Sequence, residues 1–163
     1  MLRILVVLVL ILIVIGAVLG SAASLKVDGG VLQVFTMPVA IEIPHCTHGV
    51  GYWKSHSDAW PVEEITVGGV AYTKAVAMSI LDTASGGDAT YILARQLIAT
   101  KLNLLRGADA SALETTVMDA DGWLSAHPLG TDPSDPDRAD GIALAETLDQ
   151  YNDGEIGPGS CDD

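Results

Sequence analysis

Hydrophobic positions change their spacing along the chain, and these changes divide it into three stretches. Residues 4–19 form an apolar run of Ile, Leu, Val and Ala with one Gly. Residues 24–45 are rich in β-forming residues, and within them residues 39–43 alternate at period two, which predicts extended strands. From residue 46 onward, the apolar residues recur mainly at helical intervals.

The third stretch, residues 46–163, is predicted to fold as one mainly α domain with a small β component. A Gly-Gly pair between β-branched flanks predicts a hairpin over residues 64–72. Asp88 is a good N-cap for the strongest helix, and Ser111 and Glu114 have capping-box spacing before another. About four helices are expected, over residues 73–82, 89–106, 111–126 and 137–154.

The first stretch predicts export. A short basic start that includes Arg3 precedes the apolar run, and Ser21 and Ala23 have the small-x-small spacing of a signal-peptidase site. We therefore expect residues 1–23 to be removed as a signal peptide. The alternative is an uncleaved membrane anchor, because the run is about the minimum length that spans a bilayer.

Two cysteines, Cys46 and Cys161, lie at opposite ends of the third stretch. In an exported protein this arrangement predicts a disulfide that closes nearly the whole domain. A metal–thiolate pair and two separate thiols are the alternatives.

Charge is uneven along the chain. Residues 24–106 hold seven acidic and six basic residues, whereas residues 107–163 hold fourteen acidic residues opposed only by Arg138. An acidic surface repels nucleic acid and anionic lipid, so we expect neither as a partner. It favours solubility, divalent cations or basic partners.

Two clusters of residues suggest a metal-binding site. His45, Cys46, His48 and His56 crowd twelve residues, but their spacing matches no zinc motif and the cysteine is better assigned to the disulfide. No cofactor is therefore expected, with calcium as the one alternative, at carboxylates of a Pro-rich loop that also serve helix capping and solubility. These carboxylates belong to Asp132, Asp135, Asp137 and Asp140.

No catalytic motif stands out. The sequence has no Gly-x-Ser-x-Gly elbow and no phosphate-binding Gly-Lys-Ser/Thr loop. We therefore expect a protein that is not an enzyme.

Aromatic residues concentrate at the start of the third stretch. Amphipathic rings beside a lysine could stack a sugar or a methylated cation, or they could anchor the start of the domain to its core. The patch comprises Tyr52, Trp53, His56 and Trp60.

Four ordered motifs lie between Cys46 and Cys161. They are Cys46-Thr47; Gly51-Tyr52-Trp53-Lys54 with His56 and Ala59-Trp60-Pro61; Gln96 to Asn103; and Tyr151-Asn152-x-Gly154-x-Ile156-Gly157-Pro158-Gly159-x-Cys161. Together they resemble a family of secreted bacterial and archaeal surface modules. The resemblance implies an exported module and lends no catalytic residue, and His45, His48 and the loop at 131–140 are not part of its pattern.

Residues 1–45 are also similar in layout to secreted fibre-forming matrix subunits. Our leading hypothesis is a secreted or cell-surface structural module that assembles with itself, as a homo-oligomer or filament, or with other surface proteins, through residues 24–45. The alternative is an extracellular calcium- or ligand-binding adhesion module. The residues expected to drive assembly are Val31, Val34, Phe35, Val39, Ile41 and Ile43.

Overall fold

A computed structural model describes residues 25–27, 30–32, 46–113 and 115–161. The chain divides into two compact units, Met1–Glu42 and Ile43–Asp163, which are described separately. In the first unit, strands β1 (Leu25–Val27) and β2 (Gly30–Leu32) pair antiparallel. The register places Val27 opposite Gly30, with Asp-Gly between them in the sequence, a pair that favours a tight turn.

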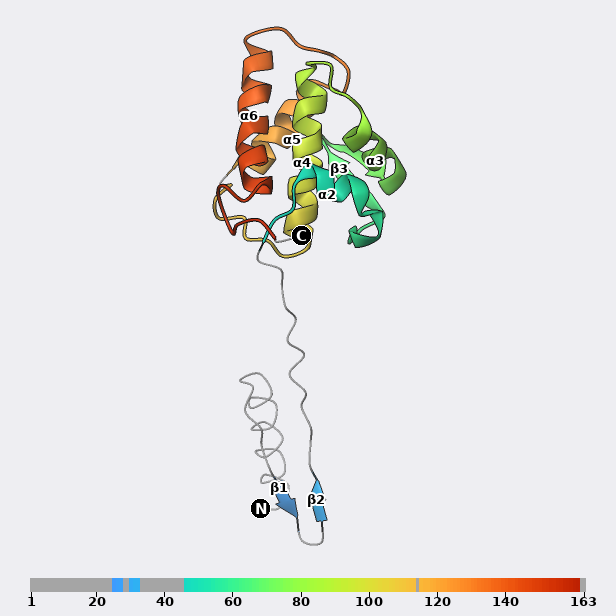
Figure 1. The fold of residues 1–163 in the computed structure, drawn as a ribbon, viewed down its shortest axis with the longest axis vertical. Coiled ribbons are helices and arrows are strands. Elements are labelled where there is room, and N and C mark those ends of the chain that lie inside the picture. Colours follow the sequence, from blue (N-terminus) through green and yellow to red (C-terminus); the bar gives the residue numbers. More distant parts are fainter. Residues whose placement is uncertain (1–24, 28–29, 33–45, 114, 162–163) are drawn as a thin grey trace, which may run out of the picture. The chain divides into compact units, whose positions relative to one another are not determined.

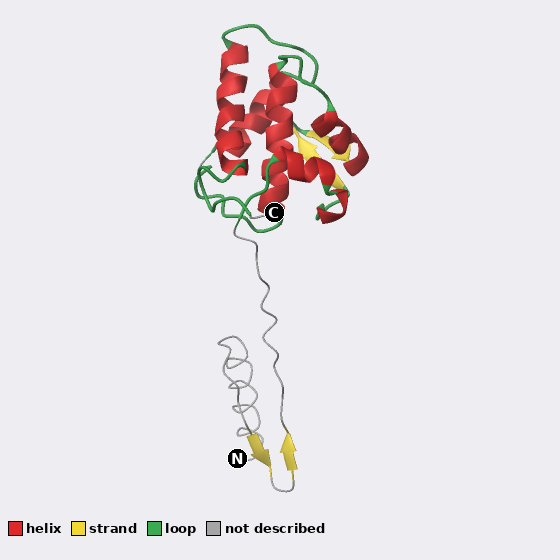
Figure 2. Ribbon diagram, viewed as in Figure 1, coloured by secondary structure: helices red, strands yellow, loops and turns green. Residues whose placement is uncertain are grey.

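The second unit is mainly helical, as the periodicity predicts (Figure 2). A 3₁₀ turn, Ser57–Ala59, follows its first short helix. The α-helices are α2 (Val50–Ser55), α3 (Lys74–Asp82), α4 (Ala89–Leu105), α5 (Thr116–Ala126) and α6 (Asp137–Asn152).

Helix α4 is the centre of this unit and contacts α2, α3, α5, α6 and the hairpin (Figure 1). Its first turn is capped as predicted, because Asp88 Oδ1 accepts hydrogen bonds from the backbone N–H and the hydroxyl of Thr90. Seven of its apolar residues are completely buried, including Leu93, Leu97 and Leu102, whereas Leu105 at its end is exposed. Burial on several faces explains why this helix holds the core together.

The hairpin forms where the Gly-Gly pair predicts it. Strand β3 (Glu64–Val67) pairs antiparallel with β4 (Val70–Thr73), and both glycines of the turn adopt positive φ angles. Alternate residues of β3, Ile65 and Val67, are buried against the helices, while Glu64 and Thr66 are exposed. The hairpin therefore covers the core with one face.

Two predicted details differ from the structure. Helix α5 begins at Thr116 instead of Ser111, because Ser111 donates its N–H and its hydroxyl to the Asp109 carboxylate and the Leu113 N–H donates to the Ala110 carbonyl in a separate turn. An additional short helix, α2, occupies the aromatic motif. Among the described residues, no helix combines the length and the apolar character needed to cross a membrane.

Candidate functional site

The point where the chain enters and leaves the helical domain is closed covalently. Cys46 and Cys161 form the predicted disulfide, with their Cα atoms 5.0 Å apart. Beside it, the Thr47 N–H donates to the Gly159 carbonyl at 2.8 Å and the Cys161 N–H donates to the Thr47 carbonyl at 2.9 Å. We call this arrangement of Cys46, Thr47, Gly159, Ser160 and Cys161 the closure site.

Two glycines allow the chain to turn tightly before the closure site. Gly154 has a φ of +75°, and a Cβ atom built there would lie 2.0 Å from the backbone nitrogen of Ser160. Gly157 has a φ of +83° and packs directly on the Tyr151 ring. The glycines of the closing motif are thus required by backbone conformation and by close packing.

A buried pair of asparagines lies next to the closure site, because Asn103 binds the backbone of His48. The Asn103 side-chain oxygen accepts from the His48 N–H at 3.0 Å and from the Trp53 indole N–H at 3.1 Å. Its amide nitrogen donates to the His48 carbonyl at 2.9 Å and to Asn152 Oδ1 at 3.0 Å. All four hydrogen-bonding positions of the Asn103 amide are used, as burial requires.

Asn152 continues this network. Its oxygen also accepts from the Thr100 hydroxyl at 3.1 Å, and its nitrogen donates to the backbone and side-chain oxygens of Gln96. Gln96 in turn donates to Asp149 Oδ1 at 2.6 Å. The asparagine network therefore joins three chain segments, namely 48–53, 96–103 and 149–152.

The aromatic patch divides into buried and exposed residues. Trp53 and Trp60 are in the core, and the Trp60 indole donates to the Trp53 carbonyl at 2.9 Å. Tyr52 is half-buried and stacks between the His48 and His56 rings, with centroids 3.6 Å and 4.3 Å away. Since both tryptophans are buried, this geometry favours core anchoring over a ligand-stacking surface.

Arg106 fastens this aromatic stack to α4. Its guanidinium lies 5.7 Å from the centroid of the Trp53 ring and donates to the Tyr52 hydroxyl at 3.4 Å. Next to Asn152 in the sequence, the Tyr151 hydroxyl donates to the Asp109 carbonyl at 2.8 Å. Burial raises the pKa of Tyr151 to about 12, so this donor keeps its proton at any physiological pH.

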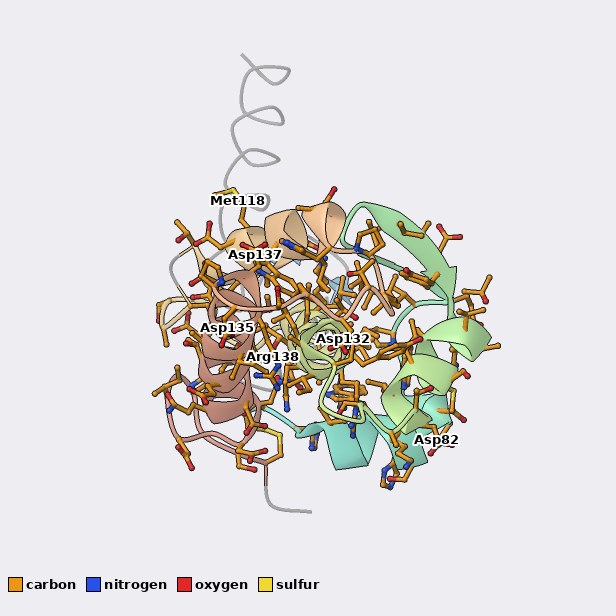
Figure 3. The ribbon with its side chains drawn as sticks, turned by 90° about the horizontal axis from the view of Figure 1, so that it is seen from above. Asp82, Met118, Asp132, Asp135, Asp137 and Arg138 are labelled. Carbon is orange, nitrogen blue, oxygen red and sulfur yellow. A yellow bond between two sulfur atoms is a disulfide. The ribbon has the colours of Figure 1, made fainter. Side chains whose placement is uncertain are left out.

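The loop carboxylates suggested for calcium are all exposed: Asp132, Asp135, Asp137 and Asp140. In Figure 3 the labelled Asp132, Asp135 and Asp137 stand at separate places along the loop and the start of α6. Asp137 contacts His127 instead, at 3.3 Å. Within the described part of the chain, no group of three or more His, Cys, Asp or Glu residues is placed to hold a metal ion.

The histidine cluster is used differently from a zinc site. His48 and His56 belong to the aromatic stack, and Cys46 is in the disulfide. His45 lies outside the described residues, as do the predicted assembly residues Val34, Phe35, Val39, Ile41 and Ile43. Val31 lies in β2.

The asparagine network is the part of the site that the sequence did not predict. Asn103 lies among apolar residues of a helical stretch, whereas Asn152 is flanked by Gln150, Tyr151 and Asp153, so the pattern of apolar residues gives no signal that its amide is buried. No protein-family model, curated protein or solved structure matches the chain. The site must therefore be interpreted from its own chemistry.

Proposed function

We propose that this chain is an exported structural module that assembles outside the cell, through residues 24–45, into homo-oligomers or a filament. The observation that carries the proposal is that the motif residues bind one another inside the helical domain. The polar and aromatic groups most distinctive in the sequence bind one another at the closure site and in the asparagine network. A domain built in this way is a stable attachment for the segment that precedes it.

The disulfide supports the extracellular part of the proposal. Disulfides persist in oxidising compartments and are rare in reducing ones, so the Cys46–Cys161 bond is consistent with the signal-peptide pattern of residues 1–23. By closing a loop with a sequence separation of 115, it also contributes roughly 4 to 5 kcal/mol in the chain-entropy model. Such a contribution suits a protein that must last without chaperones.

The N-terminal segment supports the assembly part. Residues 24–45 precede Cys46 and so fall outside the loop that the disulfide closes. Two strands within this segment, β1 and β2, pair only over three residues each. A two-stranded ribbon is marginal in water by itself, and addition to another sheet edge would stabilise strand-forming residues here.

Deletion of residues 24–44 tests the proposal. The variant keeps Cys46, so circular dichroism and a thermal melt show whether the helical domain is folded. Electron microscopy of the full-length mature protein should show assemblies, and the deletion variant should be monomeric. Identical assemblies from the folded deletion variant would disprove assembly through this segment.

A further inference from the structure

One edge of strand β3 has backbone groups directed away from its partner. In a hairpin with a two-residue turn, the pair that flanks the turn exchanges hydrogen bonds, and the pairs then alternate. Val67 and Ile65 therefore bond to β4, whereas the N–H and C=O groups of Thr66 and Glu64 point to the opposite side. Two observed bonds agree with this alternation.

The first is the bond from the Lys74 N–H to the Glu63 carbonyl at 2.8 Å, which continues the bonded series beyond the strand. The second is the bond from the Lys101 ammonium to the Thr66 carbonyl at 2.6 Å, on the outer side. In the described part of the chain, no hydrogen bond uses the Thr66 or Glu64 N–H groups. The outer edge of β3 thus offers main-chain donors to an added strand.

An open groove of about 450 Å³ runs beside this edge. Strand β3 lines it with Glu64, Ile65 and Thr66, Val62 lies just before that strand, and α4 lines it with Lys101, Leu104 and Leu105. Leu105, the last residue of α4, is 54% exposed. A strand added to β3 would lie along the groove and cover this leucine.

We propose that the groove beside β3 receives residues 39–43 of a second copy of this chain as an additional β-strand. This inference rests on the proposed function and names the surface to which the N-terminal segment would bind. The sequence of residues 39–43 alternates Val39, Ile41 and Ile43 with Ala40 and Glu42, so one face would be apolar and meet Leu104 and Leu105.

The length of the segment also matches the edge. Pro38 and Pro44 flank it, and proline cannot donate to a ladder, so the flanks limit the strand to five residues, or about 16 Å. Strand β3 has four residues. Every copy carries both the segment and the groove, and such a head-to-tail contact generates an open filament unless its rotation closes a ring.

Thr66→Pro and Ala71→Pro are a matched pair of variants that test the edge. Thr66 and Ala71 are opposite each other in a non-bonded pair, so each N–H points outward from its own side of the hairpin. Both substitutions remove one outward N–H donor and leave the β3–β4 hydrogen bonds intact. Only Thr66→Pro changes the edge of β3 to which the added strand is proposed to bind.

Leu105→Asp and Met118→Asp form a second pair. Both residues are exposed apolar side chains on helices, and Met118 on α5 does not line the groove. Each variant would be made in the full mature chain, and its melting temperature and circular dichroism would establish folding. Sedimentation velocity over a range of concentrations would then measure assembly.

We expect Thr66→Pro and Leu105→Asp to raise the protein concentration needed for assembly at least tenfold. Ala71→Pro and Met118→Asp should leave that concentration unchanged. If Thr66→Pro does not fold, Leu105→Asp decides the question. If Leu105→Asp assembles like the parent protein while the deletion of residues 24–44 is monomeric, the groove is not the binding surface. The proposed function would still stand in that case. Assembly by the deletion variant itself, or a monomeric parent chain at every concentration, would overturn both.

Discussion

Asn103 and Asn152, which are 49 residues apart in sequence, share a hydrogen bond of 3.0 Å in the interior of the domain. Their amides connect the entry of the chain, the central helix and the final helix. A buried polar network of this kind stabilises the fold only while every member keeps its partners.

Replacement of Asn103 by alanine should therefore destabilise the domain strongly. The change leaves the Trp53 indole N–H and the His48 N–H without their acceptor, and the Asn152 oxygen loses one donor. We expect the free energy of unfolding to fall by about 3 kcal/mol, measured by urea denaturation. Gln150→Ala, on the exposed side of α6, is the control and should change it by less than about 0.5 kcal/mol. Equal effects would show that the network contributes little.

The disulfide of the closure site should contribute strongly to the stability of the domain. The double variant Cys46→Ser, Cys161→Ser should lose roughly 4 kcal/mol in the free energy of unfolding, because its unfolded chain is no longer closed into a loop. The oxidised parent protein should also lose stability when a reductant is added, whereas the double variant should not respond. A reductant effect on the double variant would contradict this origin of the stability.

Gly154 and Gly159 allow the cost of a steric collision to be separated from the cost of a positive φ angle. Both have positive φ angles, +75° and +89°, but a Cβ atom collides with Ser160 at Gly154 and meets nothing within 4 Å at Gly159. Gly154→Ala should therefore cost at least about 2 kcal/mol more than Gly159→Ala in thermal or urea unfolding. Equal costs would mean that the turn relaxes to admit the methyl group.

Asp149 should make a small, pH-dependent contribution that opposes folding. Partial desolvation of this largely exposed carboxyl, and then the nearby Asp153, raise its pKa above the ordinary value. A raised folded-state pKa means that the ionised carboxylate is disfavoured in the fold. The associated stability is present below the unfolded-state pKa of 3.8 and is lost as pH rises through the folded-state value.

Asp149→Asn should accordingly raise the free energy of unfolding at pH 7, by less than about 1 kcal/mol because solvent screens this exposed group. The gain should disappear near pH 3, where both forms are neutral. Glu146→Gln on the same helix controls for the general effect of removing a negative charge. A gain for Asp149→Asn that matches this control, or that persists at pH 3, would refute the assignment.

Local signals predicted the elements that depend on neighbouring residues. The Asp88 cap and the Gly-Gly turn appear where they were expected, because each requires a few residues in one backbone conformation. The disulfide was predictable from the expectation of export and from the positions of the two cysteines. The start of α5 was not, since Ser111 found a closer partner in Asp109 than in the helix.

Long-range contacts determined what the sequence could not predict. Whether Trp53 and Trp60 bind a ligand or fill the core depends on what covers them, and they are covered by helices distant in sequence. The pairing of Asn103 with Asn152 likewise requires the contact between α4 and α6. Spacing along the chain carries no information about such contacts.

Electron microscopy of the native material, with the mature N-terminus sequenced on the same sample, tests the central claim most directly. The account predicts assemblies whose subunits begin at Ser24, after removal of residues 1–23. Monomeric particles that begin at Ser24 would contradict assembly, and a chain that begins at Met1 would contradict removal of the leader.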